Sequence, residues 1–139
     1  MKFKMETKFV VVSGKRKSAV ARVKIKEGRG KIFYNGLSYN DLRYLHRLAL
    51  TEPMRICESV IGNFNFDADI KTFGGGKEGQ IQAARLGLAK ALVKTTNSAD
   101  LRKALLAYDK HLLVADIRRK EAYKPDDSKA RAKRQTSYR

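Results

Sequence analysis

Alternation of apolar and polar side chains with a period of two marks the first part of the chain. A short β-branched run, Phe9–Ser13, is interrupted by GKRKSA, and the alternation resumes in VARVKIKEG. One face of that segment is apolar, and the other carries Val20, Arg22, Lys24 and Lys26. Period two is typical of a half-buried strand. Gly28 and Gly30 then mark a turn into KIFYNG, so we predict that these two strands pair as an antiparallel hairpin with a basic outer face.

Helical spacing dominates the middle of the chain. We predict a helix over residues 38–50, and Pro53 is a start signal for a second short helix, Met54–Ile61. Alternation in Asn63–Phe73 predicts a further strand, with Phe64, Phe66, Ala68 and Ile70 inward. A helix over Gly79–Val93 follows, with an apolar stripe on one side and Gln82, Arg85 and Lys90 facing away. Ser98 or Asp100 caps a last helix, and His111–Arg119 is predicted to be the final strand.

These elements interleave strands and helices, which favours an α+β fold in which one sheet carries helices packed on it. The length of 139 residues fits one domain. After Pro125 the apolar pattern is lost. We therefore divide the chain into a globular domain, 1–124, and an extended basic C-terminal tail, 125–139.

The charge is unusual and unevenly placed. The chain has 31 Lys and Arg against 14 Asp and Glu, a net charge of +17. Residues 1–31 carry a net +9 and residues 118–139 a net +6, whereas residues 32–117 carry only +2. A polyanion is the natural partner of such an excess, and a merely soluble basic protein is the alternative. Uniform solubilising charge would not concentrate at the two ends.

Several function classes lack supporting residues. The single cysteine, Cys57, lies among apolar neighbours and is expected to be a small buried side chain. His46 and His111 stand far apart with no carboxylate cluster beside them, so we expect no metal site. No pattern of a nucleophile with its base is visible, and no cofactor is predicted. Without a long apolar run or a signal peptide, the protein is expected to be cytoplasmic.

The glycines Gly74, Gly76 and Gly79 satisfy G-x-G-x-x-G between a predicted strand and a helix. Three interpretations stay open: a nucleotide phosphate site, a tight structural turn, and a loop whose amides and helix N-terminus meet a nucleic-acid phosphate beside Lys77. The preceding strand has a polar face, which argues against a dinucleotide fold. The first interpretation would make the protein a nucleotide-dependent phosphotransferase.

GKRKSAVARVKI and the Lys26 that follows it carry six basic residues, with no acid until Glu27. Lys15, Arg16 and Lys17 are expected in the loop, where Gly14 permits a bend. Arg22, Lys24 and Lys26 follow along one strand face at a spacing of about 6.5–7 Å, close to the phosphate repeat of an RNA strand. A plain solvated face is the alternative.

The tail ends in DDSKARAKRQTSYR and has no side chain that could anchor it in a core. We expect it to be extended and mobile on its own, with a reach of ~45 Å. Small residues between the cations would let the tail thread a narrow passage. Its basic groups can each neutralise a phosphate, and Tyr138 could stack on a base. A free-standing nucleic-acid chaperone is a further alternative that this composition allows.

Three blocks resemble the family of the ninth protein of the small ribosomal subunit: GKRKSAVARVKI, GGGKEGQIQAARLGLAKAL and DIRRKEAYKPDDSKARAKRQTSYR. The Ser-Tyr-Arg ending is similar to that of the archaeal and eukaryotic branch. The resemblance implies a split β-α-β sheet like the second domain of the fifth small-subunit protein. It also implies a seat in the subunit head on ribosomal RNA, beside other head proteins, with a tail tip that reaches the peptidyl-tRNA site.

Two groups of binding residues follow from the blocks and their charge. The rRNA group is expected to comprise Lys15, Arg16, Lys17, Arg22, Lys24, Lys26, Gly74, Gly75, Gly76, Lys77, Gln80, Arg118, Arg119 and Lys120. The resemblance implies a second group that contacts the anticodon stem-loop of the tRNA: Lys133, Arg134, Ser137, Tyr138 and Arg139.

Overall fold

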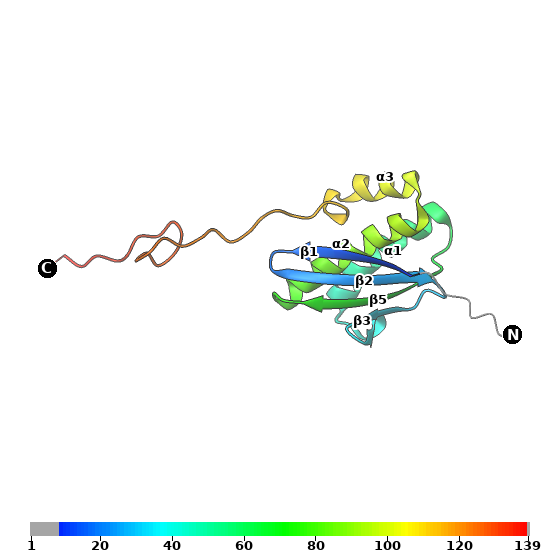
Figure 1. Ribbon diagram of the computed structural model, residues 1–139, viewed down its shortest axis with the longest axis horizontal. Helices are drawn as coiled ribbons and strands as arrows, with labels where there is room; N and C mark the ends of the chain where they lie inside the picture. The colour runs from blue at the N-terminus through cyan, green and yellow to red at the C-terminus, as the bar shows by residue number, and fades with distance from the viewer. Residues whose placement is uncertain (1–8, 139) are drawn as a thin grey trace.

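A computed structural model describes residues 9–138 and shows one mixed sheet with its helices gathered on a single face (Figure 1). The elements are β1 (Val10–Arg16), β2 (Ala19–Glu27), β3 (Ile32–Tyr34), β4 (Leu37–Ser38), α1 (Tyr44–Ile61), β5 (Phe66–Phe73), α2 (Lys77–Thr96) and α3 (Ala99–Tyr108). Two short 3-10 turns, Tyr39–Asp41 and Lys110–Leu112, precede α1 and follow α3. The predicted α+β class is confirmed.

The order of strands in the sheet is β1-β2-β5-β3-β4. β3 and β5 are parallel neighbours joined through α1, and the other pairs are antiparallel. The predicted hairpin between the second strand and KIFYNG is therefore wrong, because β2 pairs with β1 and β5 instead. Side-chain alternation specifies which face of a strand is buried, but it does not specify the neighbouring strand.

The first strand is longer than predicted. β1 continues through Gly14, Lys15 and Arg16, and only Lys17 and Ser18 form the turn into β2. Gly14 makes no bend. A Cβ on Gly14 would lie 2.1 Å from the carbonyl oxygen of Ala83 and 2.6 Å from the backbone nitrogen of Gly87, so its hydrogen side chain lets α2 approach β1 closely.

The core lies between the sheet and α2. The inner face of β2 contributes side chains with no exposed surface, Ala21, Val23 and Ile25 among them, as the alternation predicts. The predicted apolar stripe of α2 is buried too. α2 also buries Ala83, Leu86 and Ala89, because α1 and α3 pack on it in addition to the sheet. Cys57 is fully buried, and burial, with a smaller effect of Glu58, raises the pKa of its thiol to about 11.

α1 is one continuous helix of 18 residues, so the predicted division into two helices is wrong. Pro53 lies inside it, fully buried, and the packing of its ring in the core offsets the backbone hydrogen bond that proline cannot donate. The Thr51 hydroxyl donates to the backbone oxygens of Leu48 at 2.8 Å and Arg47 at 3.1 Å, which occupies carbonyl groups of the turn before the proline. The first predicted residues of this helix form the 3-10 turn instead.

The predicted final strand, His111–Arg119, is also wrong. Lys110–Leu112 form the 3-10 turn, and no regular element follows in the described chain. The reason is local: Asp116 accepts a hydrogen bond from the backbone N–H of Arg118 at 2.9 Å, and such Asp side-chain bonds compete with strand pairing. From there the chain leaves the body on the side where the β1–β2 turn lies (Figure 1).

The tail is not uniformly straight. Turns at Lys124–Asp127 and Lys129–Ala132 are each closed by a backbone hydrogen bond, and Arg131 pairs with Glu121 at 3.0 Å. These contacts fold part of the tail onto itself without contacting the body. The division at residue 125 stays a prediction.

Candidate nucleic-acid interface

Three segments far apart in the sequence meet at one end of the sheet. They are the β1–β2 turn with Lys17, the glycine loop after β5, and residues 118–120, which lead from the body into the tail. One cleft of ≈ 810 Å³ is lined by Arg16, Lys17, Ser18, Arg118, Arg119 and Lys120. A second cleft of ≈ 570 Å³ shares Arg16, Lys17 and Ser18 and continues along the glycine loop to Lys77. The β1–β2 turn therefore stands between two clefts, and eight of the fourteen predicted rRNA-binding residues line them.

The glycine loop is shaped by its backbone. Gly74 and Gly75 have φ of 68° and 63°, values that side chains rarely adopt. A Cβ on Gly74 would also lie 2.7 Å from the carbonyl oxygen of Ser18. The Gln80 side chain donates to the Gly74 carbonyl oxygen at 3.0 Å and braces the loop. This geometry accounts for Gly74 and Gly75 as a tight turn against the β1–β2 hairpin, and it leaves Gly76 and Lys77 facing the cleft.

The cations around the clefts differ in their availability. Arg16 forms an ion pair with Asp116, and the Arg16 side chain is 22% exposed. Arg118 pairs with the same carboxylate at 2.7 Å. Within residues 9–138, no ion pair joins Lys17, Lys77 or Arg119 to a carboxylate. Lys120 lies over the ring of Tyr123, 4.6 Å from its centroid. A phosphate would therefore meet Lys17, Lys77, Arg119 and Lys120 more readily than Arg16.

The outer face of the sheet carries Arg22, Lys24 and Lys26, all exposed, as predicted. Their cross-strand neighbours on β5 differ, however. Arg22 is opposite Lys71, whereas Lys24 is opposite Asp69 and Lys26 is opposite Asp67. Charges directly opposite each other on one face of a sheet interact. The positive potential is therefore strongest at Arg22, on the half of the sheet nearer the β1–β2 turn.

Asp67 also organises the loop between β2 and β3. One of its carboxylate oxygens accepts hydrogen bonds from the backbone N–H groups of Lys31 and Arg29, both at 2.9 Å. The hydrogen bond from Lys31 is the main reason why the pKa of Asp67 lies below its ordinary value. Burial acts in the opposite direction, but the hydrogen bond from Arg29 and the charge of Lys26 also lower the pKa.

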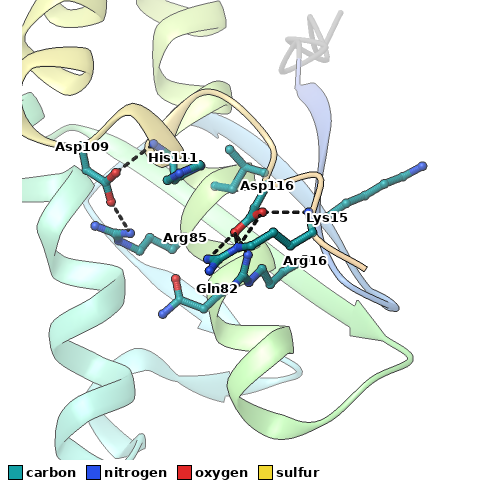
Figure 2. A pocket seen from close by; sticks show the side chains of 9 residues that line it. Lys15, Arg16, Gln82, Arg85, Asp109, His111 and Asp116 are labelled. Atoms are coloured by element: carbon teal, nitrogen blue, oxygen red, sulfur yellow. Dashed lines mark hydrogen bonds and ion pairs between the residues drawn. The ribbon is translucent and has the colours of Figure 1, made fainter. Parts of the chain in front are cut away.

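Two clusters of ion pairs were not predicted from the sequence. Asp116 joins the tail to β1, and Arg85, expected to face solvent, is only 13% exposed. Arg85 pairs with Glu52 of α1 at 2.5 Å. It also pairs with Asp109 at the end of α3 at 3.0 Å (Figure 2). Burial opposes ionisation of Asp109, but the hydrogen bonds from the His111 N–H and Arg85 outweigh it, so its pKa lies below the ordinary value. Nothing local in the sequence identifies these partners, which are 24 to 100 residues apart.

The predicted tRNA-contacting residues lie apart from the clefts. Lys133, Arg134, Ser137 and Tyr138 are exposed near the far end of the tail, and Tyr138 is 93% exposed. The backbone N–H of Arg134 donates to Asp127 at 3.4 Å. Arg139 lies outside the described residues. The two groups of candidate residues are therefore separated by the length of the tail (Figure 1).

Other kinds of site find little support. In the part of the chain that the structure describes, no three His, Cys, Asp or Glu residues are grouped so that they could hold a metal ion. His46, predicted to be structural or at the surface, contacts Glu78 at 2.7 Å. Across the same residues, no helix combines the length and the apolar character that crossing a membrane requires.

Comparison with known proteins gives consistent matches. The model of the family described as ribosomal protein S9/S16 matches residues 14–139. The small ribosomal subunit protein uS9 of Methanococcus maripaludis (strain S2) is 43% identical over 136 residues, which cover 95% of this chain and 99% of that protein. The protein of the same name from Methanococcus vannielii is 40% identical, with the same coverage. Both similarities extend over the body and the tail.

Proposed function

This chain belongs to the ribosomal protein S9/S16 family, and from that premise we propose that the two clefts beside the β1–β2 turn bind ribosomal RNA in the head of the small subunit, and that the tail contacts the tRNA in the peptidyl site. Membership makes the chain a structural constituent of the small ribosomal subunit in the cytoplasm, with a role in translation, and not an enzyme. The phosphotransferase and the free-standing chaperone are thereby set aside. Other proteins of the subunit head would be its neighbours.

The convergence of three basic segments at one end of the sheet carries the rRNA part of the proposal. Each phosphate that a Lys or Arg neutralises releases counterions, so binding of this kind weakens as salt rises. The two clefts border the same turn, and Lys17 can reach a phosphate in either of them. Gly76 adds a backbone that can approach closely, because a Cβ there would meet nothing within 4 Å.

The composition and position of the tail support the tRNA part. Its last described residues are cationic or small, no apolar side chain among them could bury itself in the body, and Tyr138 is almost fully exposed. Phosphate contacts position a protein without reading sequence, so such a tail suits the backbone of any tRNA that enters the site. The resemblance to the family, rather than the charge alone, points to the peptidyl site.

Removal of the tail tip tests this proposal. We expect that deletion of Lys129–Arg139 weakens retention of tRNA in the peptidyl site of reconstituted small subunits, because several phosphate contacts are lost. The measurement is filter binding of labelled tRNA to subunits that contain the full-length or the shortened protein.

The control is incorporation of the shortened protein into subunits, which should stay at the level of the full-length chain because the clefts are intact. Equal tRNA retention by the two kinds of subunit would contradict the tRNA part of the proposal. Failure of incorporation would instead show that the tail is needed for rRNA binding.

A further inference from the structure

The segment of residues 115–124, which leads from the body into the tail and is called the root of the tail below, is held to the body by one carboxylate. Asp116 lies between the 3-10 turn and the first tail cations, and its side chain is only 9% exposed. It accepts an ion-paired hydrogen bond from Arg16 at the end of β1, 100 residues away in sequence (Figure 2). Arg118 donates two further hydrogen bonds to the same carboxylate, one from its Nε at 2.9 Å and one from its backbone N–H at 2.9 Å.

Few other contacts restrain this segment. Within the described chain, no backbone–backbone hydrogen bond involves residues 115–123. The last such bond of the body is donated by Val114 to Lys110 at 3.0 Å, and the next along the chain closes the turn at Lys124–Asp127. The side chain of Asp116 is thus the main polar link between the first residues of the tail and the sheet.

The position of this carboxylate does not suit a role in phosphate binding. It borders the cleft that Arg16, Arg118 and Arg119 line, where a negative charge repels phosphate and occupies two guanidinium groups. A nearly buried carboxylate is costly unless it is paired and hydrogen-bonded, and removal of a partner leaves an uncompensated charge. The Asp116 carboxylate must therefore contribute by fixing the position of the chain rather than by binding phosphate.

We propose that Asp116 is a positioning residue that clamps the root of the tail to β1 through Arg16 and Arg118 and so sets the direction in which the tail leaves the body. About 20 residues separate this root from the tip, a reach of about 65–70 Å when extended. A fixed root restricts the volume that the tip samples and raises its effective concentration at a site in that direction. This inference rests on the proposed contact of the tail with tRNA.

The direct test compares full-length protein with Asp116→Asn, which removes the charge but keeps the shape. Spin labels at Lys103→Cys on α3 and at Ala122→Cys, six residues after Asp116, report the distance between the body and the root of the tail, because both positions are exposed and the natural Cys57 is fully buried. We expect a narrow distance distribution for the parent protein and a clearly broader one for Asp116→Asn.

Glu121→Gln is the matched control. It removes the same charge from an exposed ion pair within the tail, that of Glu121 with Arg131, and it leaves the root untouched. It should keep the narrow distribution.

If Asp116→Asn does not fold, Arg16→Gln replaces it, since Arg16→Gln breaks the link to β1 while Arg118 still pairs with the carboxylate. The double exchange Arg16→Asp with Asp116→Arg restores an ion pair and should recover the narrow distribution.

The same variants, without labels, separate this inference from the proposed function. In reconstituted subunits we expect Asp116→Asn to lower tRNA retention severalfold and Glu121→Gln to leave it near the parent level. A distance distribution that Asp116→Asn and Arg16→Gln leave unchanged would overturn the clamp. A broader distribution with full tRNA retention would uphold the clamp as a link between body and tail but overturn its role in tRNA binding, while the deletion of Lys129–Arg139 tests the contact of the tail with tRNA separately.

Discussion

Arg22 and Lys26 project from the same face of β2, yet they have different electrostatic surroundings. Lys71 lies opposite Arg22, and Asp67 lies opposite Lys26. A cation that no carboxylate faces can neutralise a phosphate and release the counterions condensed on the RNA, whereas a cation that already faces a carboxylate does so less. The two residues should therefore contribute unequally to binding, although the sequence presents them as equivalent.

We expect Arg22→Gln to reduce the slope of log K against log salt for rRNA binding by about 0.7–0.9, the loss of one phosphate contact. Lys26→Gln, which removes the same charge, should reduce it much less. The measurement is a salt titration of binding to a fragment of small-subunit rRNA. Equal changes for the two variants would show that the cross-strand aspartate does not neutralise Lys26, and no change for either would identify a solvated face.

Asp67 makes the conformation of the β2–β3 loop dependent on pH. Because the pKa of its carboxyl is lowered in the folded protein, the stabilisation that it provides is present above its ordinary value of 3.8 and is lost as the pH falls through the lower folded value. Asp67→Ala should therefore be less stable than the parent protein at neutral pH, and this difference should vanish in strong acid.

Urea unfolding of the two proteins across this pH range measures the difference. Amide hydrogen exchange at Arg29 and Lys31, whose N–H groups donate to Asp67, reports the same change locally. A difference in stability that is the same at both ends of the pH range would contradict the assignment.

At the scale of elements, the close contact of β1 with α2 depends on two glycines that face each other. A Cβ on Gly87 would lie 2.8 Å from Cγ2 of Val23 and 3.3 Å from the backbone nitrogen of Gly14. Protein interiors are packed as densely as organic crystals, so an added methyl group must displace its neighbours. This contact positions the β1–β2 turn, and with it the clefts.

We expect Gly87→Ala to lower the free energy of unfolding by roughly 1–3 kcal/mol, the usual cost of overpacking a core. Gly14→Ala should cost more, because its Cβ would meet the backbone of α2 rather than a side chain. Gly76→Ala is the matched control, since its φ of −98° suits alanine and the space around it is open. Chemical denaturation measures all three variants, and a Gly14→Ala protein as stable as the control would contradict this account of the packing.

Elements also resolved two ambiguous signals in the sequence. A proline after a helical segment is compatible with a new helix or with a helix that continues, and Pro53 continues α1 because its ring is buried in the core. The apolar start of HLLVADIRR resembles a strand. Asp116 instead turns the backbone at Arg118, and Leu112 packs in the core from a 3-10 turn.

At the scale of the whole molecule, the buried core that stabilises the fold and the charged tail occupy different parts of the chain. The core lies between the sheet and the helices, and no residue of the described chain from Leu113 onward is fully buried. The deletion of Lys129–Arg139 proposed above should therefore leave the midpoint of thermal unfolding unchanged. It removes one exposed ion pair, Arg131 with Glu121, and such pairs contribute little. A large fall in the midpoint would show that the tail belongs to the folded unit.

Local periodicity and composition determined a large part of this protein. The buried face of β2, the inward residues of β5, the presence of α2 and α3, and the concentration of charge at the two ends all follow from residues close together in the chain. The alternation and the helical stripes depend on backbone geometry that repeats every two or 3.6 residues. The concentration of charge follows from the numbers of basic and acidic residues in each segment. The three sequence blocks also sufficed to identify the family.

Only the tertiary structure decided which strands are neighbours, which cations face aspartates, and how the tail is attached. β3 lies beside β5 because α1 carries the chain across the sheet, and this places Asp67 near the β2–β3 loop. Arg16 and Asp116 meet across 100 residues. Contacts of this kind form when elements pack, and no local pattern encodes the partner of a side chain. The free cations of the interface could therefore be separated from the paired ones only in the folded molecule.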